Sequence, residues 1–166
     1  MTAPALNGIH HLKVHVSDAR RSARWYRRVL GYQPSLEFYE DGQLVGFGMN
    51  HPAGGTTLTI RLDPELARQT SAGVYFEMGV HGEAGLYDLA EHLDRVREPH
   101  GPVVRTPIGW ILPGVYDPDR HQMRFYVSDP AREPDDHRPR RIHQAGTAQA
   151  HTEPLTVIDL GLDDAT

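Results

Sequence analysis

The chain has 166 residues, of which 39% are hydrophobic and 23% are charged, a balance typical of a soluble globular domain. Its formal net charge of −5 argues against a nucleic-acid-binding protein, and no run approaches the roughly 20 apolar residues of a membrane span. There is no cysteine, and the first residues lack the basic and apolar regions of a secretory signal. We therefore expect a cytoplasmic protein that handles small molecules, with neither nucleic acid nor membrane as a partner.

The first half of the chain predicts a strand, a helix and three further strands. In chain order these are a strand at 8–16, a helix at 19–30, a hairpin at 34–50 and a strand at 56–62. Ser17 and Asp18 supply side chains that cap the helix, and Gly31 is its stop signal. Asp41-Gly42 is typical of a tight hairpin turn. This half is one βαβββ module.

The second half repeats that order. Its elements are a strand within 72–80, a helix within 83–98, two short strands within 103–119 and a closing strand within 121–127. Pro107 and Pro113 predict edges or bends in the two short strands. The predicted class is α+β, with module one at about 8–62 and module two at about 72–128, together one domain over 1–128.

Residues 129–166 differ in composition from the rest of the chain. They are rich in Pro, Arg and Asp without periodicity, which predicts a linker and a mobile C-terminal tail. Within them LTVIDLGL (155–162) is a short apolar run. It is interpreted either as an added strand, as a segment that docks on a neighbouring subunit, or as a frayed terminus.

Two βαβββ modules that open with GIHHLKVHVSDARRSARWYRRVLG and close with DPDRHQMRFY resemble the vicinal oxygen chelate superfamily. That superfamily includes glyoxalase I, bleomycin resistance proteins, extradiol dioxygenases and fosfomycin resistance enzymes. The resemblance covers about residues 8–128. It implies that the mixed sheets of the two modules curl into a cup that holds a small-molecule ligand and often a divalent metal (Fe, Mn, Zn or Ni). It also implies a homodimer.

The resemblance places four metal-ligand positions, one on the first and one on the last strand of each module. The first falls on His11, which is a good ligand. The others fall near Thr59, near Gly73 and on Arg124, none of which supplies a suitable lone pair. Because a divalent ion needs about three or four protein ligands, we expect no metal cofactor. The alternative is a displaced metal site in which His11 recruits other residues, such as His15, Glu77, His143 or His151.

Strand alternation predicts the side chains that line the cup, because the faces opposite the apolar ones point into it. The predicted lining, with Trp110 as an aromatic wall near the rim, is His11, Lys13, His15, Thr57, Thr59, Arg61, Tyr75, Glu77, Gln122, Arg124 and Tyr126. His11, Lys13, Glu77 and Arg124 are the predicted catalytic residues. The predicted substrate-binding residues are His15, Arg61, Tyr75, Trp110, Gln122 and Tyr126. Two structural alternatives remain: an Arg124–Glu77 salt bridge, and a Lys13 side chain that reaches out to solvent.

The predicted lining favours an anionic or phenolic ligand. Arg124 offers a fork of N–H groups for an oxyanion, while Glu77 or His11 could take a proton. The first hypothesis is therefore a metal-independent acid–base enzyme of the lyase, isomerase or cyclase kind, for example in natural-product metabolism. The second is a protein of the bleomycin resistance type that sequesters a drug or natural product. The third is a metal-dependent glyoxalase or dioxygenase with displaced ligands.

Overall fold

The structure is a computed structural model that describes residues 8–71, 73–129, 140–143 and 151–154. At 74–75, 140–143 and 151–154 only the backbone is described. The elements, in chain order, are β1 (His11–Val16), α1 (Ala19–Leu30), β2 (Gln33–Glu40), β3 (Gln43–Asn50), β4 (Thr57–Leu62), α2 (Pro64–Thr70), β5 (Val74–Gly79), α3 (Gly82–Arg95), β6 (Val104–Thr106), β7 (Gly109–Tyr116), β8 (Gln122–Ser128), β9 (Arg140–His143) and β10 (His151–Pro154).

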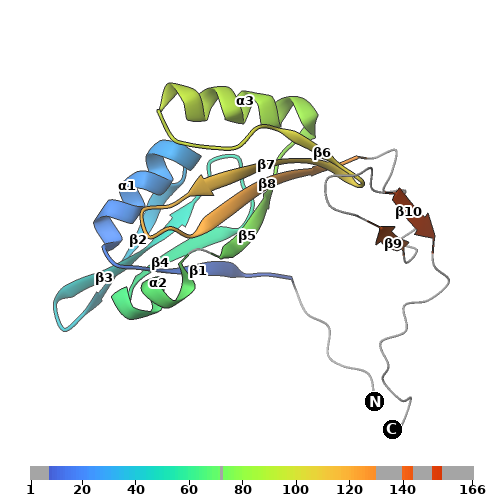
Figure 1. The fold of residues 1–166 in the computed structure, drawn as a ribbon. Coiled ribbons are helices and arrows are strands. Elements are labelled where there is room, and N and C mark those ends of the chain that lie inside the picture. Colours follow the sequence, from blue (N-terminus) through green and yellow to red (C-terminus); the bar gives the residue numbers. More distant parts are fainter. Residues whose placement is uncertain (1–7, 72, 130–139, 144–150, 155–166) are drawn as a thin grey trace, which may run out of the picture.

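The predicted class is confirmed, since two modules each form a mixed four-stranded sheet. The strand orders are β1-β4-β3-β2 and β5-β8-β7-β6. In each sheet the first strand pairs in parallel with the last, and the other pairs are antiparallel. In Figure 1, α3 lies along one side of the second sheet, and α1 packs against β3 and β4 of the first. The strand that opens each module therefore lies beside the strand that closes it.

The predicted helix cap, helix end and strand bend are confirmed at three positions. Asp18 caps α1 by accepting the backbone N–H of Arg21 at 2.9 Å, and this bond lowers the pKa of the Asp18 carboxyl. Gly31 ends the helix in the left-handed region at φ 77°, a conformation that favours glycine. Pro113 lies where the β7–β8 register shifts, so the bulge accommodates a residue that cannot donate to the ladder.

One hydrophobic core runs through both modules. Module one contributes the buried faces of α1, β1, β3 and β4, and module two those of α3, β7 and β8. Val14 and Val16 on β1, and Met123 and Phe125 on β8, are at most 3% exposed. The strand alternation read from the sequence therefore assigns the buried faces of these strands correctly.

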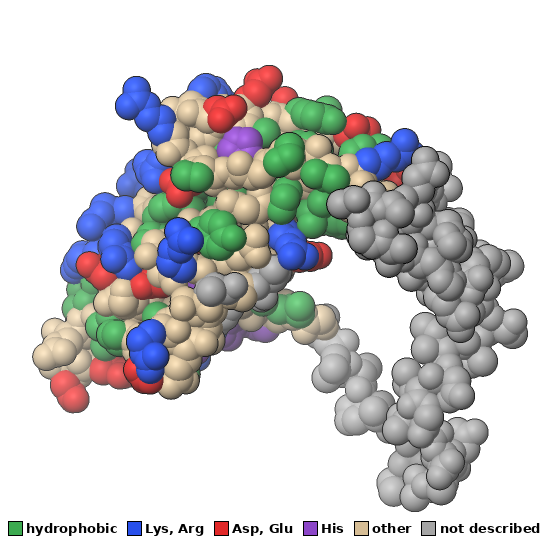
Figure 2. All heavy atoms as spheres, in the orientation of Figure 1, with side chains coloured by type: hydrophobic (Ala, Val, Ile, Leu, Met, Phe, Trp, Pro, Cys, Tyr) green, Lys and Arg blue, Asp and Glu red, His purple; other side chains and the backbone are tan. Residues whose placement is uncertain are grey.

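Arginines on the outer side of α1 face solvent. Arg20, Arg24 and Arg27 are exposed, and Figure 2 shows basic and acidic side chains intermixed at this end of the molecule. Arg28 turns to module two instead, where it donates to the backbone oxygen of Val96 and to Glu98, at 2.9 and 2.8 Å. No helix in the described ranges is long and apolar enough to cross a membrane.

Two features differ from the sequence prediction. The segment after β4 forms α2, whose Asp63 side chain accepts the N–H of Leu66 at 3.0 Å and whose first residue is Pro64. Seven residues were too few to show a helical period. The segment predicted to be an irregular linker and tail contains β9 and β10, which pair antiparallel. Four-residue strands without apolar alternation leave little signal. The run at 155–162 lies outside the described residues.

Candidate functional site

We use 'outward face' for the side of each sheet that is turned away from the hydrophobic core, which is the side predicted to line the cup. On β1 and β4 this face carries the first group of predicted site residues. Parallel register pairs His11 with Thr57, Lys13 with Thr59 and His15 with Arg61. Paired residues share a face, and the alternate positions Leu58 and Ile60 are fully buried on the other side. His11 and Lys13 are exposed, while His15 is half-buried. The first sheet thus presents imidazole, ammonium and hydroxyl groups on one face, as strand alternation predicts; that this face lines a ligand cup stays a prediction.

Several members of this group have local partners, among them Thr57, whose hydroxyl donates to Oδ1 of Asn50 at 3.0 Å. Arg61 donates to the Glu40 carboxylate at the end of β2, with an Nη2–Oε1 distance of 2.5 Å. The Nδ1 atoms of His10 and His11 are 2.9 Å apart. The Arg61 guanidinium is therefore drawn away from β1 along the surface of the sheet, which weakens its case as a ligand-binding residue.

Arg124 and Glu77 form the centre of the second group. They are register partners on β8 and β5, and Nη1 of Arg124 lies 3.6 Å from Oε1 of Glu77. Charge-assisted hydrogen bonds between such groups span about 2.7–2.9 Å, so this ion pair is loose. Nε of Arg124 is buried and has no hydrogen-bond partner, although the side chain as a whole is 39% exposed. The salt-bridge alternative is present in the structure, yet it uses only part of the guanidinium.

The remaining predicted residues of module two fall into two sets. Gln122 and Tyr126 lie on the same face of β8 as Arg124, each two residues away, and both are half-buried. Tyr75 lies where the β5–β8 register shifts, and its side chain is outside the described part. The bulge had no mark in the sequence, so alternation alone could not place the start of β5.

Trp110 is the one predicted lining residue that the structure moves to the other face. It pairs with Val127 on β8, on the same side as Phe125, and packs against the hydrophobic core. The Arg105 guanidinium stacks over its ring at 5.3 Å. Ile111, paired with Tyr126, takes the position on the outward face. The expected aromatic wall is therefore wrong, because the face of β7 was assigned from proximity rather than from its register with β8.

Apolar residues on β2 belong to the outward face of the first sheet, although they are absent from the predicted lining. Leu36 pairs with Gly48 and Phe38 with Gly46, on the same face as Thr59. Leu36 is 59% exposed, and its side chain lies over Gly48. A Cβ atom added to Gly48 would be 3.2 Å from the Cβ of Leu36. Gly46 and Gly48 have no side chains on this face. We call the neighbouring side chains of Leu36 and Phe38 the apolar shelf. A strand with alternate glycines next to a strand with apolar residues was the available signal.

The residues present do not fit the divalent metal that the resemblance implies. Within the described residues no group of three or more His, Asp or Glu side chains could hold a metal ion. His11 on β1 is paired with Thr57 on β4, and Glu77 on β5 is paired with the cation Arg124 on β8. The side chains of His143 and His151, named as displaced ligands, lie outside the described part. We therefore assign no reaction step to a metal.

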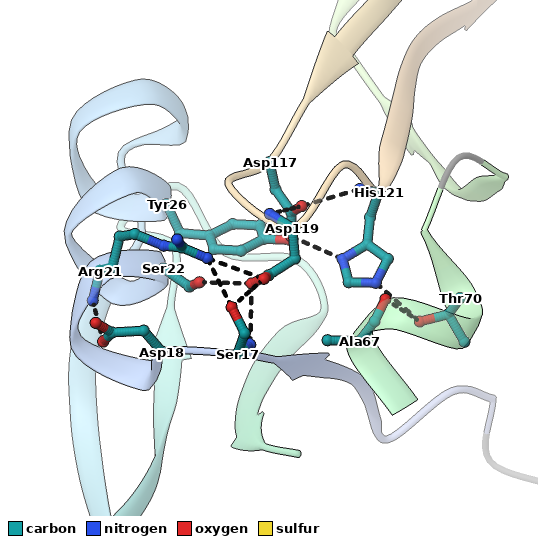
Figure 3. Close-up of polar contacts among 10 residues, drawn as sticks. All are labelled: Ser17, Asp18, Arg21, Ser22, Tyr26, Ala67, Thr70, Asp117, Asp119 and His121. Atoms are coloured by element: carbon teal, nitrogen blue, oxygen red, sulfur yellow. Dashed lines mark hydrogen bonds and ion pairs between the residues drawn. The ribbon is translucent and has the colours of Figure 1, made fainter. Parts of the chain in front are cut away.

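The turn between β7 and β8 carries a hydrogen-bond network that joins the two modules (Figure 3). The Asp119 carboxylate accepts the backbone N–H and the hydroxyl of Ser17, the guanidinium of Arg21 at 2.9 Å and the hydroxyl of Ser22 at 3.4 Å. These donors lie at the start of α1, in the other module. The pairing fixes the position of the loop that leads directly into the strand of Arg124.

Two buried residues of the same turn extend this network. Asp117 is 3% exposed and His121 is fully buried. The Asp117 carboxylate lies 2.9 Å from Nδ1 of His121 and accepts the hydroxyl of Tyr26 at 3.1 Å. Nε2 of His121 is 2.8 Å from the hydroxyl of Thr70 on α2. We call Asp117, Asp119 and His121 the clasp; the sequence indicated a turn here, but its role between modules was missed because turns carry no periodicity.

Comparison with known proteins supplies a family for this arrangement. Residues 8–125 match the family model described as the Glyoxalase/Bleomycin resistance protein/Dioxygenase superfamily. A search of curated proteins gives no match.

Solved structures with the same fold share little sequence with the chain. A glyoxylase/bleomycin resistance protein/dioxygenase domain from Frankia sp. EAN1pec superimposes with a TM-score of 0.61 at 20% identity, over 75% of this chain and 100% of that one. An antibiotic-binding protein from Streptomyces sp. CB03234 gives 0.59 at 13%, over 76% and 100%. A fosfomycin resistance protein variant from Listeria monocytogenes, complexed with Mn(II) and 1S,2S-dihydroxypropylphosphonic acid, gives 0.59 at 10%, over 77% and 97%.

Proposed function

Since this chain belongs to the glyoxalase/bleomycin resistance protein/dioxygenase superfamily, we propose that it binds a small oxygenated molecule, anionic or phenolic, against the outward strand faces. The observation that supports this most is the state of Arg124. Its Nε is buried without a partner, and its Nη1 is only loosely paired with Glu77. The partly exposed end of the guanidinium can therefore donate charge-assisted hydrogen bonds to a ligand oxygen.

The same pair supports acid–base chemistry without a metal. A carboxylate, phenolate or enolate oxygen on Arg124 would place the neighbouring atoms of the ligand beside Glu77, whose carboxylate can accept a proton. The proton moves to a Glu77 oxygen while the guanidinium stabilises the negative charge that develops on the ligand oxygen. His11 is the second candidate base and Lys13 the second cation. This is a lyase, isomerase or cyclase type of step.

A second candidate function is sequestration of a drug or natural product. The apolar shelf of Leu36 and Phe38, beside Gly48 and Gly46 on the same face, favours it, because apolar lining suits a bulky natural product more than a small acid. The antibiotic-binding protein from Streptomyces sp. CB03234 has the same fold, which makes such a role compatible with the architecture. We further propose a homodimer, which light scattering would measure.

The Arg124→Glu variant tests the anion site. With 4-hydroxybenzoate as a probe that carries both a carboxylate and a phenol, we expect saturable binding to the wild type by calorimetry and none to Arg124→Glu. Arg24→Glu, an equal change of charge at an exposed arginine on α1, should bind like the wild type. Equal binding by all three proteins would refute the proposal.

Turnover separates the two candidate functions once a tighter ligand is found. Product detected by mass spectrometry, and lost in Glu77→Gln, supports the enzyme. Stoichiometric binding that leaves the ligand unchanged supports sequestration. Metal analysis that finds about one equivalent, with activity lost to a chelator, would contradict the metal-independent assignment.

A further inference from the structure

The two modules meet at two junctions that the repeat makes equivalent. At each one, the turn before the closing strand of one module approaches the start of the other module's helix. The first junction joins the β7–β8 turn to α1, and the second joins the β3–β4 loop (51–56) to α3. The contents of the two junctions can therefore be compared position by position, counting from the first residue of each helix.

The first junction is filled by polar side chains. Asp119 accepts donors from Ser17, Arg21 and Ser22, and Asp117 accepts the hydroxyl of Tyr26 (Figure 3). The carboxylates of the turn and the donors of the helix occupy the space between the modules, and Tyr26 is fully buried there.

The second junction lacks every one of those groups. Counted from the start of α3 at Gly82, the positions of Ser17, Arg21, Ser22 and Tyr26 are occupied by Val80, Ala84, Gly85 and Leu89. The 51–56 loop contains no carboxylate, and its glycines Gly54 and Gly55 have φ of 87° and 93°. A Cβ added to Gly54 would meet no atom within 4 Å. Small and apolar residues have thus replaced both halves of the polar contact.

The result is a cavity of about 620 Å³ between the modules. This volume lies in the range of roughly 300–1,000 Å³ that holds small-molecule ligands. Its apolar walls come from both modules and include Leu12, Val29, Met78, Val80, Leu89 and Phe125. Leu12, Met78 and Phe125 belong to the faces of β1, β5 and β8 opposite to the predicted cup, and Val29 and Leu89 come from α1 and α3. The cavity therefore lies mostly on the other side of these strands from the outward faces, and among the predicted site residues whose side chains the structure describes, Glu77 alone lines it.

The polar part of the lining selects for an uncharged ligand. Within the described part of the chain no Lys or Arg lines the cavity, and the single carboxylate found there, that of Glu77, is loosely paired with Arg124. His51 accepts the N–H of Ala53 at Nδ1, which leaves its Nε2 as a donor. His92 donates from Nε2 to the backbone oxygen of Val29 at 3.1 Å, which leaves its Nδ1 as an acceptor. On an apolar ring system, the His51 donor suits a carbonyl or hydroxyl oxygen, and the His92 acceptor suits a hydroxyl or amine hydrogen.

We propose that this junction cavity is a second binding site, for a neutral and mostly apolar ring compound that carries a hydroxyl, carbonyl or amine group. The site works independently of Arg124 and of the anionic ligand proposed for the outward faces. A ligand in this cavity contacts both modules. It would therefore connect them at the second junction, as the clasp does at the first. Binding should therefore stabilise the folded chain as well as fill the cavity.

The probe for the test is N-phenyl-1-naphthylamine, a neutral aromatic amine whose fluorescence rises in apolar surroundings. We expect saturable binding of one equivalent to the full chain, with excitation above the absorption of Trp. Leu89→Trp fills the cavity from α3 and should weaken binding by at least about tenfold. Ala53→Trp fills it from an exposed loop, and so remains informative if the helix variant does not fold.

Two controls separate this site from the others. Tyr87→Trp adds the same side chain to α3 at a position that is 50% exposed and does not line the cavity, so it should bind like the wild type. Arg124→Glu should also leave the probe affinity unchanged, even if it abolishes anion binding. The proposal is overturned if the wild type binds no probe, if both cavity-filling variants retain affinity within about twofold, or if Tyr87→Trp loses as much as they do.

Discussion

Removing the Asp119 carboxylate should weaken the whole domain, because it is the acceptor for three residues of the other module. In Asp119→Ala the backbone N–H and hydroxyl of Ser17 lose their partner, which costs about 1 kcal/mol for each bond. The Arg21 pair adds about 0.5 kcal/mol, since the Arg21 side chain is 45% exposed and screened by solvent. The contact with Ser22, at 3.4 Å, adds little.

The expected loss is therefore about 2–3 kcal/mol, or a fall in Tm of about 5–10 °C for a chain of this size. Urea denaturation followed by far-UV circular dichroism measures it. Glu65→Ala is the matched control: Glu65 also accepts hydrogen bonds from Arg68 and Gln69, but within one exposed helix, and its removal should leave stability unchanged. Equal effects in the two variants would refute the assignment of the clasp as the tie between modules.

Three further outcomes follow from single residues. Gly46→Ala should fail to fold or lose about 3 kcal/mol of unfolding free energy in urea denaturation, because the new Cβ would lie 2.2 Å from the backbone oxygen of Ile60. Gly79→Ala, whose Cβ would meet no atom within 4 Å, should keep the stability of the wild type. Burial raises the pKa of the Tyr32 phenol above its ordinary value of 10.0, so wild-type stability should fall as pH rises through that raised pKa. Tyr32→Phe should make this fall smaller. Parallel curves of stability against pH for the two proteins would contradict the assignment. Asp18→Ala should lower the free energy of unfolding by about 1 kcal/mol at pH 7, because the helix cap is lost. Since the pKa of Asp18 is lowered in the folded state, this difference in stability from the wild type should shrink as pH falls below about 4. A difference that stays constant with pH would argue against the cap.

Period and punctuation explain why the fold could be predicted. The alternation of Val14 and Val16 with His15, and the stop at Gly31, are local signals that the packed structure keeps. The same alternation puts Arg124 and Glu77 on faces opposite the core, and their pairing is one of two structural alternatives; the structure makes them register partners. Where a strand is regular and one face is apolar, the sequence determines which side chains share a surface.

The misses have a common cause in positions where that regularity fails. Trp110 lies just before the bulge at Pro113, so its face depends on pairing with Val127 rather than on alternation along β7. The clasp lies in a turn, and its partners are far away in sequence. The junction cavity depends on what the side chains of two distant segments leave unfilled. None of these three is a property of a local window of residues.

The sequence separation across the clasp has a consequence for how the protein is made. Ser17 and Asp119 are 102 residues apart, so the first module leaves the ribosome long before its partner turn exists. At 5–20 residues per second this interval lasts about 5–20 seconds, far longer than a module of this size needs to form its helix and hairpin. During it Tyr26 and Ser22, buried in the finished protein, remain open to water and to other chains. These positions are therefore covered only after the β7–β8 turn has been made.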